Sequence, residues 1–180
     1  MVVLGAGSWG TALALQFARR GQPVRLWGRD RAQLAGMREA RVNARYLPGA
    51  AFPGNLEAFV ELEDCLDGAR DVLVAVPSHG FRETLEAIRP LLANGARVCW
   101  ATKGFEQDSG LLPHQVAREE LGPDTPLAVL SGPTFAKEVG EGLPTAIGVQ
   151  VGAANAHLVD GHQRFAFAWL IWFVGLRGDE

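Results

Sequence analysis

The first ten residues, Met1-Val2-Val3-Leu4-Gly5-Ala6-Gly7-Ser8-Trp9-Gly10, decide the fold that the sequence predicts. An apolar run typical of a strand breaks into glycines and then into residues with helical spacing. Gly5 permits a tight turn, Gly7 lets a pyrophosphate approach backbone N–H groups, and Gly10 lets the helix pack closely on the strand. Alone this pattern is weak, because any glycine-rich turn from strand to helix matches it.

The residues that follow strengthen this interpretation. Residues 11–20 carry apolar side chains at helical spacing, Gly21 stops the helix, and Val24-Arg25-Leu26-Trp27 is typical of a second strand. A β-α-β unit opening on this glycine pattern favours dinucleotide binding over a purely structural turn.

The rest of the chain continues the alternation of strands and helices. Near-continuous apolar runs such as Val72-Leu73-Val74-Ala75-Val76 are typical of parallel strands buried on both faces. We expect helices over residues 30–41, 64–68, 81–92 and 111–121, strands within 56–62, 72–76, 97–101 and 127–130, and a loop at 46–49. This order predicts an α/β fold with a doubly wound parallel sheet, a Rossmann-like dinucleotide-binding domain.

Composition narrows the class of protein. The chain has 180 residues, of which 48% are hydrophobic and 21% charged, with a formal net charge of −3 and no basic block. We therefore expect neither nucleic acid nor an anionic membrane as a partner. Cys65 and Cys99 are too few for a disulfide framework and lack metal-ligand spacing, so we expect reduced thiols, no metal site and a cytoplasmic location. We also expect no secretory signal.

The end of the second strand bears on cofactor choice. A site selective for NAD carries an acid there for the ribose 2′-hydroxyl, but this chain has Gly28 followed by Arg29. A guanidinium can bind a 2′-phosphate through two hydrogen bonds, which favours NADP or dual use of NADP and NAD. The alternative is that Arg29 is a solvated surface residue.

Lysine is scarce, since the chain has only Lys103 and Lys137, each just after a predicted strand end. A lysine opposite a glycine-rich phosphate turn is suited to pairing with a substrate phosphate or polarising a carbonyl. Either lysine could instead be solvated near a turn. Tyr46, in the predicted loop, either lines the cofactor site or covers the loop.

Five ordered motifs identify a family. They are 5-GAGSWGTA-12, 26-LWGRD-30, 76-VPSH-79, 101-ATKG-104 and 131-SGPTFAKEV-139. In order and spacing they resemble the bacterial NAD(P)-dependent glycerol-3-phosphate dehydrogenases, over about residues 1–150. Five motifs are much more specific than one glycine pattern.

The resemblance implies a reaction and a set of contacts. NAD(P)H would reduce dihydroxyacetone phosphate to sn-glycerol 3-phosphate, the precursor of glycerophospholipids. It implies cofactor contacts for Ser8, Trp9, Arg29, Tyr46 and Ala136 beside the glycines Gly5, Gly7 and Gly10, substrate contacts for Gly132 and Thr134, and contacts to both for Lys103.

The resemblance ends near Val151. The family continues into a helical domain whose lysine acts as general acid and base, but this chain has no lysine after Lys137, so we assign no catalytic residue and expect that domain to be absent. Residues 151–180 form an atypical tail with no assigned domain, and its apolar run over 165–176 is too short to span a bilayer. The family's homodimer does not follow for this chain.

Two alternatives to the dehydrogenase follow from the sequence. One is a catalytically inactive dinucleotide-binding module, because the chain keeps the cofactor motifs without the proton donor. The other is a different dehydrogenase on the same fold, such as a 6-phosphogluconate or hydroxyacid type, and the motifs at 102–104 and 131–134 argue against it.

Overall fold

The structure, a computed structural model, describes residues 1–131, 135–143 and 148–151. Within these residues a seven-stranded sheet has the order β5-β2-β1-β6-β7-β8-β9. The strands are β1 (Val2–Leu4), β2 (Val24–Trp27), β5 (Leu56–Phe59), β6 (Asp71–Val74), β7 (Arg97–Trp100), β8 (Leu127–Ser131) and β9 (Gly148–Val151). The hairpin of β3 (Val42–Asn43) and β4 (Leu47–Ala51) is a separate antiparallel pair.

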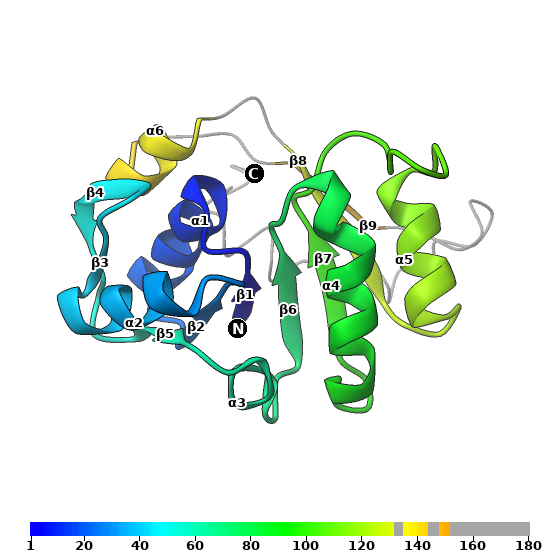
Figure 1. Cartoon of the computed structure of the whole chain (residues 1–180), viewed down its shortest axis with the longest axis horizontal. Helices are drawn as coiled ribbons and strands as arrows, with labels where there is room; N and C mark the ends of the chain where they lie inside the picture. The colour runs from blue at the N-terminus through cyan, green and yellow to red at the C-terminus, as the bar shows by residue number, and fades with distance from the viewer. Residues whose placement is uncertain (132–134, 144–147, 152–180) are drawn as a thin grey trace, which may run out of the picture.

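The helices divide into two groups, as Figure 1 shows with α1 and α6 on the left and α4 and α5 on the right. One group is α1 (Ser8–Arg19), α2 (Arg31–Ala40) and α6 (Ala136–Glu141), and the other is α3 (Leu62–Leu66), α4 (Phe81–Ile88) and α5 (Pro113–Leu121). The 3₁₀ turns η1 (Ser78–Gly80) and η2 (Arg89–Leu91) flank α4.

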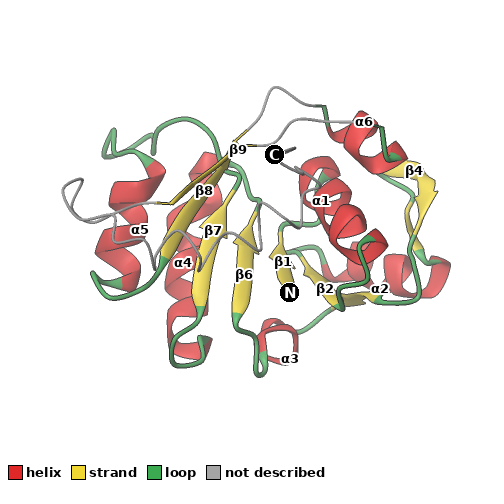
Figure 2. Cartoon of the chain, turned by 180° about the vertical axis from the view of Figure 1, so that it is seen from behind, coloured by secondary structure: helices red, strands yellow, loops and turns green. Residues whose placement is uncertain are grey.

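Alternation along the strands explains why both faces of the sheet are covered. Successive side chains point to opposite faces, so Val3 and the residues paired with it in register, Leu26 and Leu73, pack under α1 and α2. The neighbouring row, Val2 with Val72, joins the side chains of α4 and α5 in a second buried cluster. Figure 2 shows β6, β7 and β8 side by side within this one sheet.

The predicted doubly wound parallel sheet is confirmed for six strands, from β5 to β8 in the sheet order. At the edge, β9 pairs antiparallel with β8, which the sequence did not predict. The predicted loop at 46–49 is also wrong in part, because Leu47 to Ala51 form β4. Pro48 and Gly49 are more typical of a turn than of a strand, but both are tolerated in an isolated hairpin.

Helix boundaries differ from the predicted ones by a few residues. The helix predicted over 81–92 ends at Ile88 and tightens into η2, which contains Pro90. Proline lacks an N–H and clashes with the preceding turn, so an α-helix cannot continue through it. The short predicted helix over 64–68 is shifted to 62–66. In the described part of the chain, no helix has the length and apolar character needed to cross a membrane.

Candidate functional site

The site lies where the sheet order reverses, between β1 and β6. The chain leaves β1 for α1 on one face and leaves β6 for α4 on the other. In open α/β sheets this divergence opens a crevice at the carboxyl ends of the strands, where ligands bind. The glycine turn follows β1 and the Val76-Pro77 segment follows β6, so both border the crevice.

Two of the three glycines of the opening turn are required by the backbone. Gly5 has φ +119°, its N–H donates to the Trp27 carbonyl at 2.7 Å, and a Cβ there would lie 2.5 Å from the Ala75 oxygen. A Cβ on Gly10 would lie 1.9 Å from the Gly5 oxygen, so only glycine lets α1 pack this closely. Around Gly7, by contrast, no atom lies within 4 Å of the Cβ position.

The open space at Gly7 lies at the start of α1. Gly7 is the N-cap residue of this 12-residue helix, so it has no side-chain oxygen for the N–H groups of the first turn, and that turn holds no acidic residue. A helix N-terminus carries a partial positive charge and unpaired N–H donors. Its geometry therefore suits an anionic group lying against the backbone of Gly7.

A cavity of about 440 Å³, the central cavity, extends from this turn. It joins the glycine turn to the ends of β6 and β7 and to the start of α6. Its described lining residues are Gly7, Ser8, Trp9, Ala75, Val76, Pro77, Ala101, Thr102, Lys103, Phe135 and Ala136. Five candidates from the sequence therefore come together around one space, namely Gly7, Ser8, Trp9, Lys103 and Ala136.

Two further cavities border the central one. The outer cavity, about 580 Å³, is lined by Tyr46 and β4 residues and by residues along the whole of α6. It shares Ser8, Phe135 and Ala136 with the central cavity. The lateral cavity, about 310 Å³, lies between the end of β7 and α5. Lys103 lines both the central and the lateral cavity, so its side chain stands at their boundary.

Arg29 stands apart from these cavities, beyond the end of β2. Its Nη1 lies 3.3 Å from Glu83 Oε2 of α4. Packing explains the glycine at the adjacent position 28, since a Cβ there would lie 2.9 Å from the Ala6 Cβ. An acidic residue at position 28 would therefore collide with the glycine turn.

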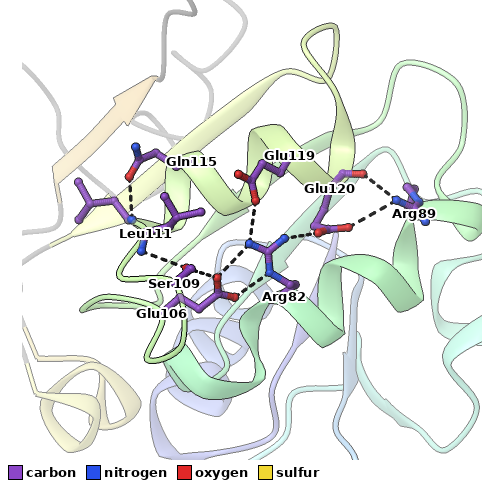
Figure 3. Close-up of polar contacts among 9 residues, drawn as sticks. Arg82, Arg89, Glu106, Ser109, Leu111, Gln115, Glu119 and Glu120 are labelled. Carbon is purple, nitrogen blue, oxygen red and sulfur yellow. Dashed lines mark hydrogen bonds and ion pairs between the residues drawn. The ribbon is translucent and has the colours of Figure 1, made fainter.

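The loop that follows Lys103 is fastened to two helices by Arg82 (Figure 3). From α4, Arg82 donates to both carboxylate oxygens of Glu106, at 2.8 and 2.9 Å, and to Glu119 of α5 at 2.8 Å. It also pairs with Glu120, which Arg89 contacts at 3.4 Å. The guanidinium, with help from the Ser109 hydroxyl, lowers the pKa of Glu106 to about 2. This loop therefore has a fixed anchor three residues after Lys103.

Asn43 was missed by the sequence reasoning. It is fully buried, and its Nδ2 donates to the Ala6 carbonyl at 3.0 Å and to Thr11 Oγ1 at 2.7 Å. It thus ties β3 to the glycine turn and to α1. Its only signal in the sequence was an asparagine near turn chemistry, which solvated loops share.

Of the remaining candidates, Lys137 and Tyr46 line the outer cavity with exposed side chains, and two others lie outside the described residues. Lys137 is 81% exposed and lies 4.0 Å from Glu141 on α6, while Tyr46 is 41% exposed with the Arg45 guanidinium 5.2 Å from its ring centre. Gly132 and Thr134 lie outside the described residues. Among the described residues, no three acidic, histidine or cysteine side chains are grouped as metal ligands.

The strand order, the glycine turn and the cavity at the switch point define the class: a Rossmann-like domain of the dinucleotide-binding type.

Comparison with known proteins identifies the family within this class. Residues 1–157 match the family model described as the N-terminus of NAD-dependent glycerol-3-phosphate dehydrogenase. Proteins named glycerol-3-phosphate dehydrogenase, NAD(P)+, are 56% identical over 149 residues in Stenotrophomonas maltophilia strain R551-3 and 55% over 147 residues in Idiomarina loihiensis. These alignments cover 83% and 82% of this chain, which spans only 44% of each relative.

Similar solved structures lead to the same family and fold. The glycerol-3-phosphate dehydrogenase of Coxiella burnetii has a TM-score of 0.85 at 40% identity, over 99% of this chain and 50% of that one. A prephenate dehydrogenase from Aquifex aeolicus shares the fold, with a TM-score of 0.66 at 14% identity over 97% of this chain and 58% of that one. The chain belongs to the NAD-dependent glycerol-3-phosphate dehydrogenase family, matching its N-terminal part.

Proposed function

We propose that this chain provides the cofactor-binding part of an NAD(P)-dependent glycerol-3-phosphate dehydrogenase. Residues 1–150 would form the NAD(P)-binding domain, and residues 151–180 are assigned to no domain. The substrate pair is dihydroxyacetone phosphate and glycerol 3-phosphate, in glycerophospholipid synthesis. When bound, NAD(P)H supplies the hydride for the substrate carbonyl. The names of the relatives, each about twice as long as the aligned segment, support this activity.

The residues of the glycine turn would hold the dinucleotide. Its diphosphate would lie against the open backbone of Gly7 and accept hydrogen bonds from the first turn of α1. Gly5 and Gly10 would act indirectly, by permitting the turn. Ser8, Trp9, Tyr46 and Ala136 would contact the cofactor from the walls of the two adjoining cavities, and Arg29 would contact its adenosine end.

Lys103 gives the strongest support for a substrate site, because it lines both the central and the lateral cavity beside the glycine turn. An ammonium group at that boundary suits an anionic substrate held next to the cofactor. We propose that Lys103 contacts both, orienting the phosphate or polarising the carbonyl. Gly132 and Thr134 would complete the substrate contacts. We propose the cytoplasm as compartment, which the free thiols of Cys65 and Cys99 support.

The experiment is a titration of the purified chain with NADPH and NADH, followed by an assay of dihydroxyacetone phosphate reduction. Gly7→Ala should weaken both cofactors about tenfold or more without loss of stability, because its methyl group would enter space that the diphosphate needs. The matched control is Gly36→Ala on the exposed side of α2, where the Cβ also meets no atom within 4 Å.

The outcomes separate cofactor binding from catalysis. Equal affinities of Gly7→Ala and Gly36→Ala for NADPH would contradict the proposed position of the diphosphate against the glycine turn. Absence of binding by the unaltered chain would overturn the proposed function. Turnover would support the dehydrogenase, and then Lys103→Gln should raise KM for dihydroxyacetone phosphate. Binding without turnover would restrict this chain to holding the cofactor.

A further inference from the structure

A carboxylate faces the arginine at the end of β2. Glu83 Oε2, in the first turn of α4, lies 3.3 Å from Arg29 Nη1. The guanidinium also lies against Gly80, where a Cβ would stand 3.9 Å from Arg29 Cζ. Arg29 therefore reaches from β2 across the switch point to the helix on the other side of the crevice.

The other nearby charges are engaged elsewhere. Asp30, the next residue, caps α2 by accepting the Gln33 N–H at 3.0 Å, and its other oxygen lies 3.7 Å from Arg45 Nη1. Arg82, beside Glu83 on α4, pairs with Glu106, Glu119 and Glu120. Glu83 is thus the carboxylate that the described structure pairs with Arg29.

The geometry points to Glu83 as a residue that determines cofactor specificity together with Arg29. This inference rests on the proposed function, since it takes the end of β2 as the site of the adenosine ribose. Position 28 cannot hold the acid of an NAD-selective site without a clash, because a Cβ there meets Ala6. Glu83 instead supplies a carboxylate beside the Arg29 guanidinium, from a different element.

The two side chains have opposite preferences for the ribose substituent. A 2′-phosphate is a dianion that pairs with a guanidinium but must displace, and is repelled by, the carboxylate of Glu83. A 2′-hydroxyl carries a proton that a carboxylate accepts, as in NAD-selective sites. The Arg29 and Glu83 pair therefore serves both cofactors and keeps the preference for either one small.

The test is direct binding of NADPH and NADH to the whole chain and to Glu83→Gln. Because the pair is exposed, we expect a change of about two- to fivefold: tighter NADPH and unchanged or weaker NADH. The change should shrink at high salt. Arg29→Gln should move the ratio of the two dissociation constants in the opposite direction, toward NADH.

The matched control is Glu86→Gln, which removes the same charge from an exposed position one turn further along α4. The inference is overturned if Glu83→Gln leaves the ratio of dissociation constants where Glu86→Gln leaves it, or weakens both cofactors equally. In either case the unaltered chain still binds the cofactors, so the proposed function stands. If the unaltered chain binds neither cofactor, the proposed function fails and this inference with it.

Discussion

At the scale of single residues, glycine is present at each of the three positions of the opening turn for a different physical reason. Gly5 has a positive φ and Gly10 faces a backbone oxygen, so both are required by the turn itself. Gly7 is required by neither, because the space at its Cβ position is open. Only Gly7 therefore lacks an explanation within the fold, which is the reason that the binding experiment is placed there.

Asn43 is the residue whose loss should cost most stability near the site. Asn43→Ala leaves the buried Thr11 hydroxyl without the donor at 2.7 Å and leaves the Ala6 carbonyl with Gln33 Nε2 as its side-chain donor, so the free energy of unfolding should fall by about 1–3 kcal/mol. Urea unfolding measures the change. Gln33→Ala is the control, because Gln33 is only partly buried and water can replace its bond to Ala6. A loss no larger than that of the control would contradict the prediction.

At the scale of elements, the Arg82 anchor joins α4, α5 and the loop after β7. The loop also closes on itself, since the Glu106 N–H donates to the Leu111 carbonyl and the Gly110 N–H donates to the Glu106 carbonyl, each at 2.9 Å. Ser109 Oγ accepts from the Leu111 N–H at 3.1 Å. The loop carrying Lys103 is therefore bonded both internally and to its neighbours.

This anchor predicts a dependence of stability on pH. The pKa of Glu106 is about 2 in the folded chain, below its ordinary value of 4.5. Its ionised form therefore stabilises the fold above pH 4.5, and that contribution falls as the pH drops toward 2. In Glu106→Gln this part of the acid sensitivity should disappear.

Urea midpoints at about pH 6, 4 and 3 measure the effect, because they follow the protons taken up on unfolding. The difference between the unaltered chain and Glu106→Gln should narrow as the pH falls. Glu86→Gln serves as control, since it removes an exposed carboxylate from the same helix pair. A difference that stays constant across these pH values would show that the Arg82 pairing does not stabilise the loop.

At the scale of the whole molecule, the sheet separates two buried clusters, and each contains one cysteine. Cys99 of β7 lies under the α1 face, and Cys65 of α3 lies with α4 and α5. Burial raises the pKa of both thiols to about 12. At pH 8 the thiolate fraction is then on the order of one in ten thousand.

We predict that both thiols resist a disulfide reagent until the fold opens. Cys65 should react first, because its five-residue helix can open locally, while Cys99 in an inner strand requires global unfolding. Cys65→Ala and Cys99→Ala assign the two phases in a labelling experiment across urea concentrations. Labelling of Cys99 at a rate independent of urea would contradict this arrangement.

Much of the fold and part of the site follow from sequence. Buried parallel strands are continuous apolar runs, and a right-handed crossover leaves few ways to order them, so the doubly wound sheet was predictable. The glycine turn and Lys103 were found because both follow strand ends, which a parallel sheet brings to one edge. The hairpin was missed because β3 has two residues and β4 contains Pro48 and Gly49, and the edge strand β9 was missed because its four residues include Gly148 and Gln150.

By itself, the sequence determined the class of fold, the glycine turn and the family, since these depend on local spacing and on ordered motifs. Only the tertiary structure decided which charges meet. Arg29 and Glu83 are 54 positions apart, and Arg82 and Glu106 are 24 apart. An arginine or glutamate that forms an ion pair has the same appearance in the sequence as one that does not. Their partners depend on how helices and loops lie across the sheet, which no local pattern records.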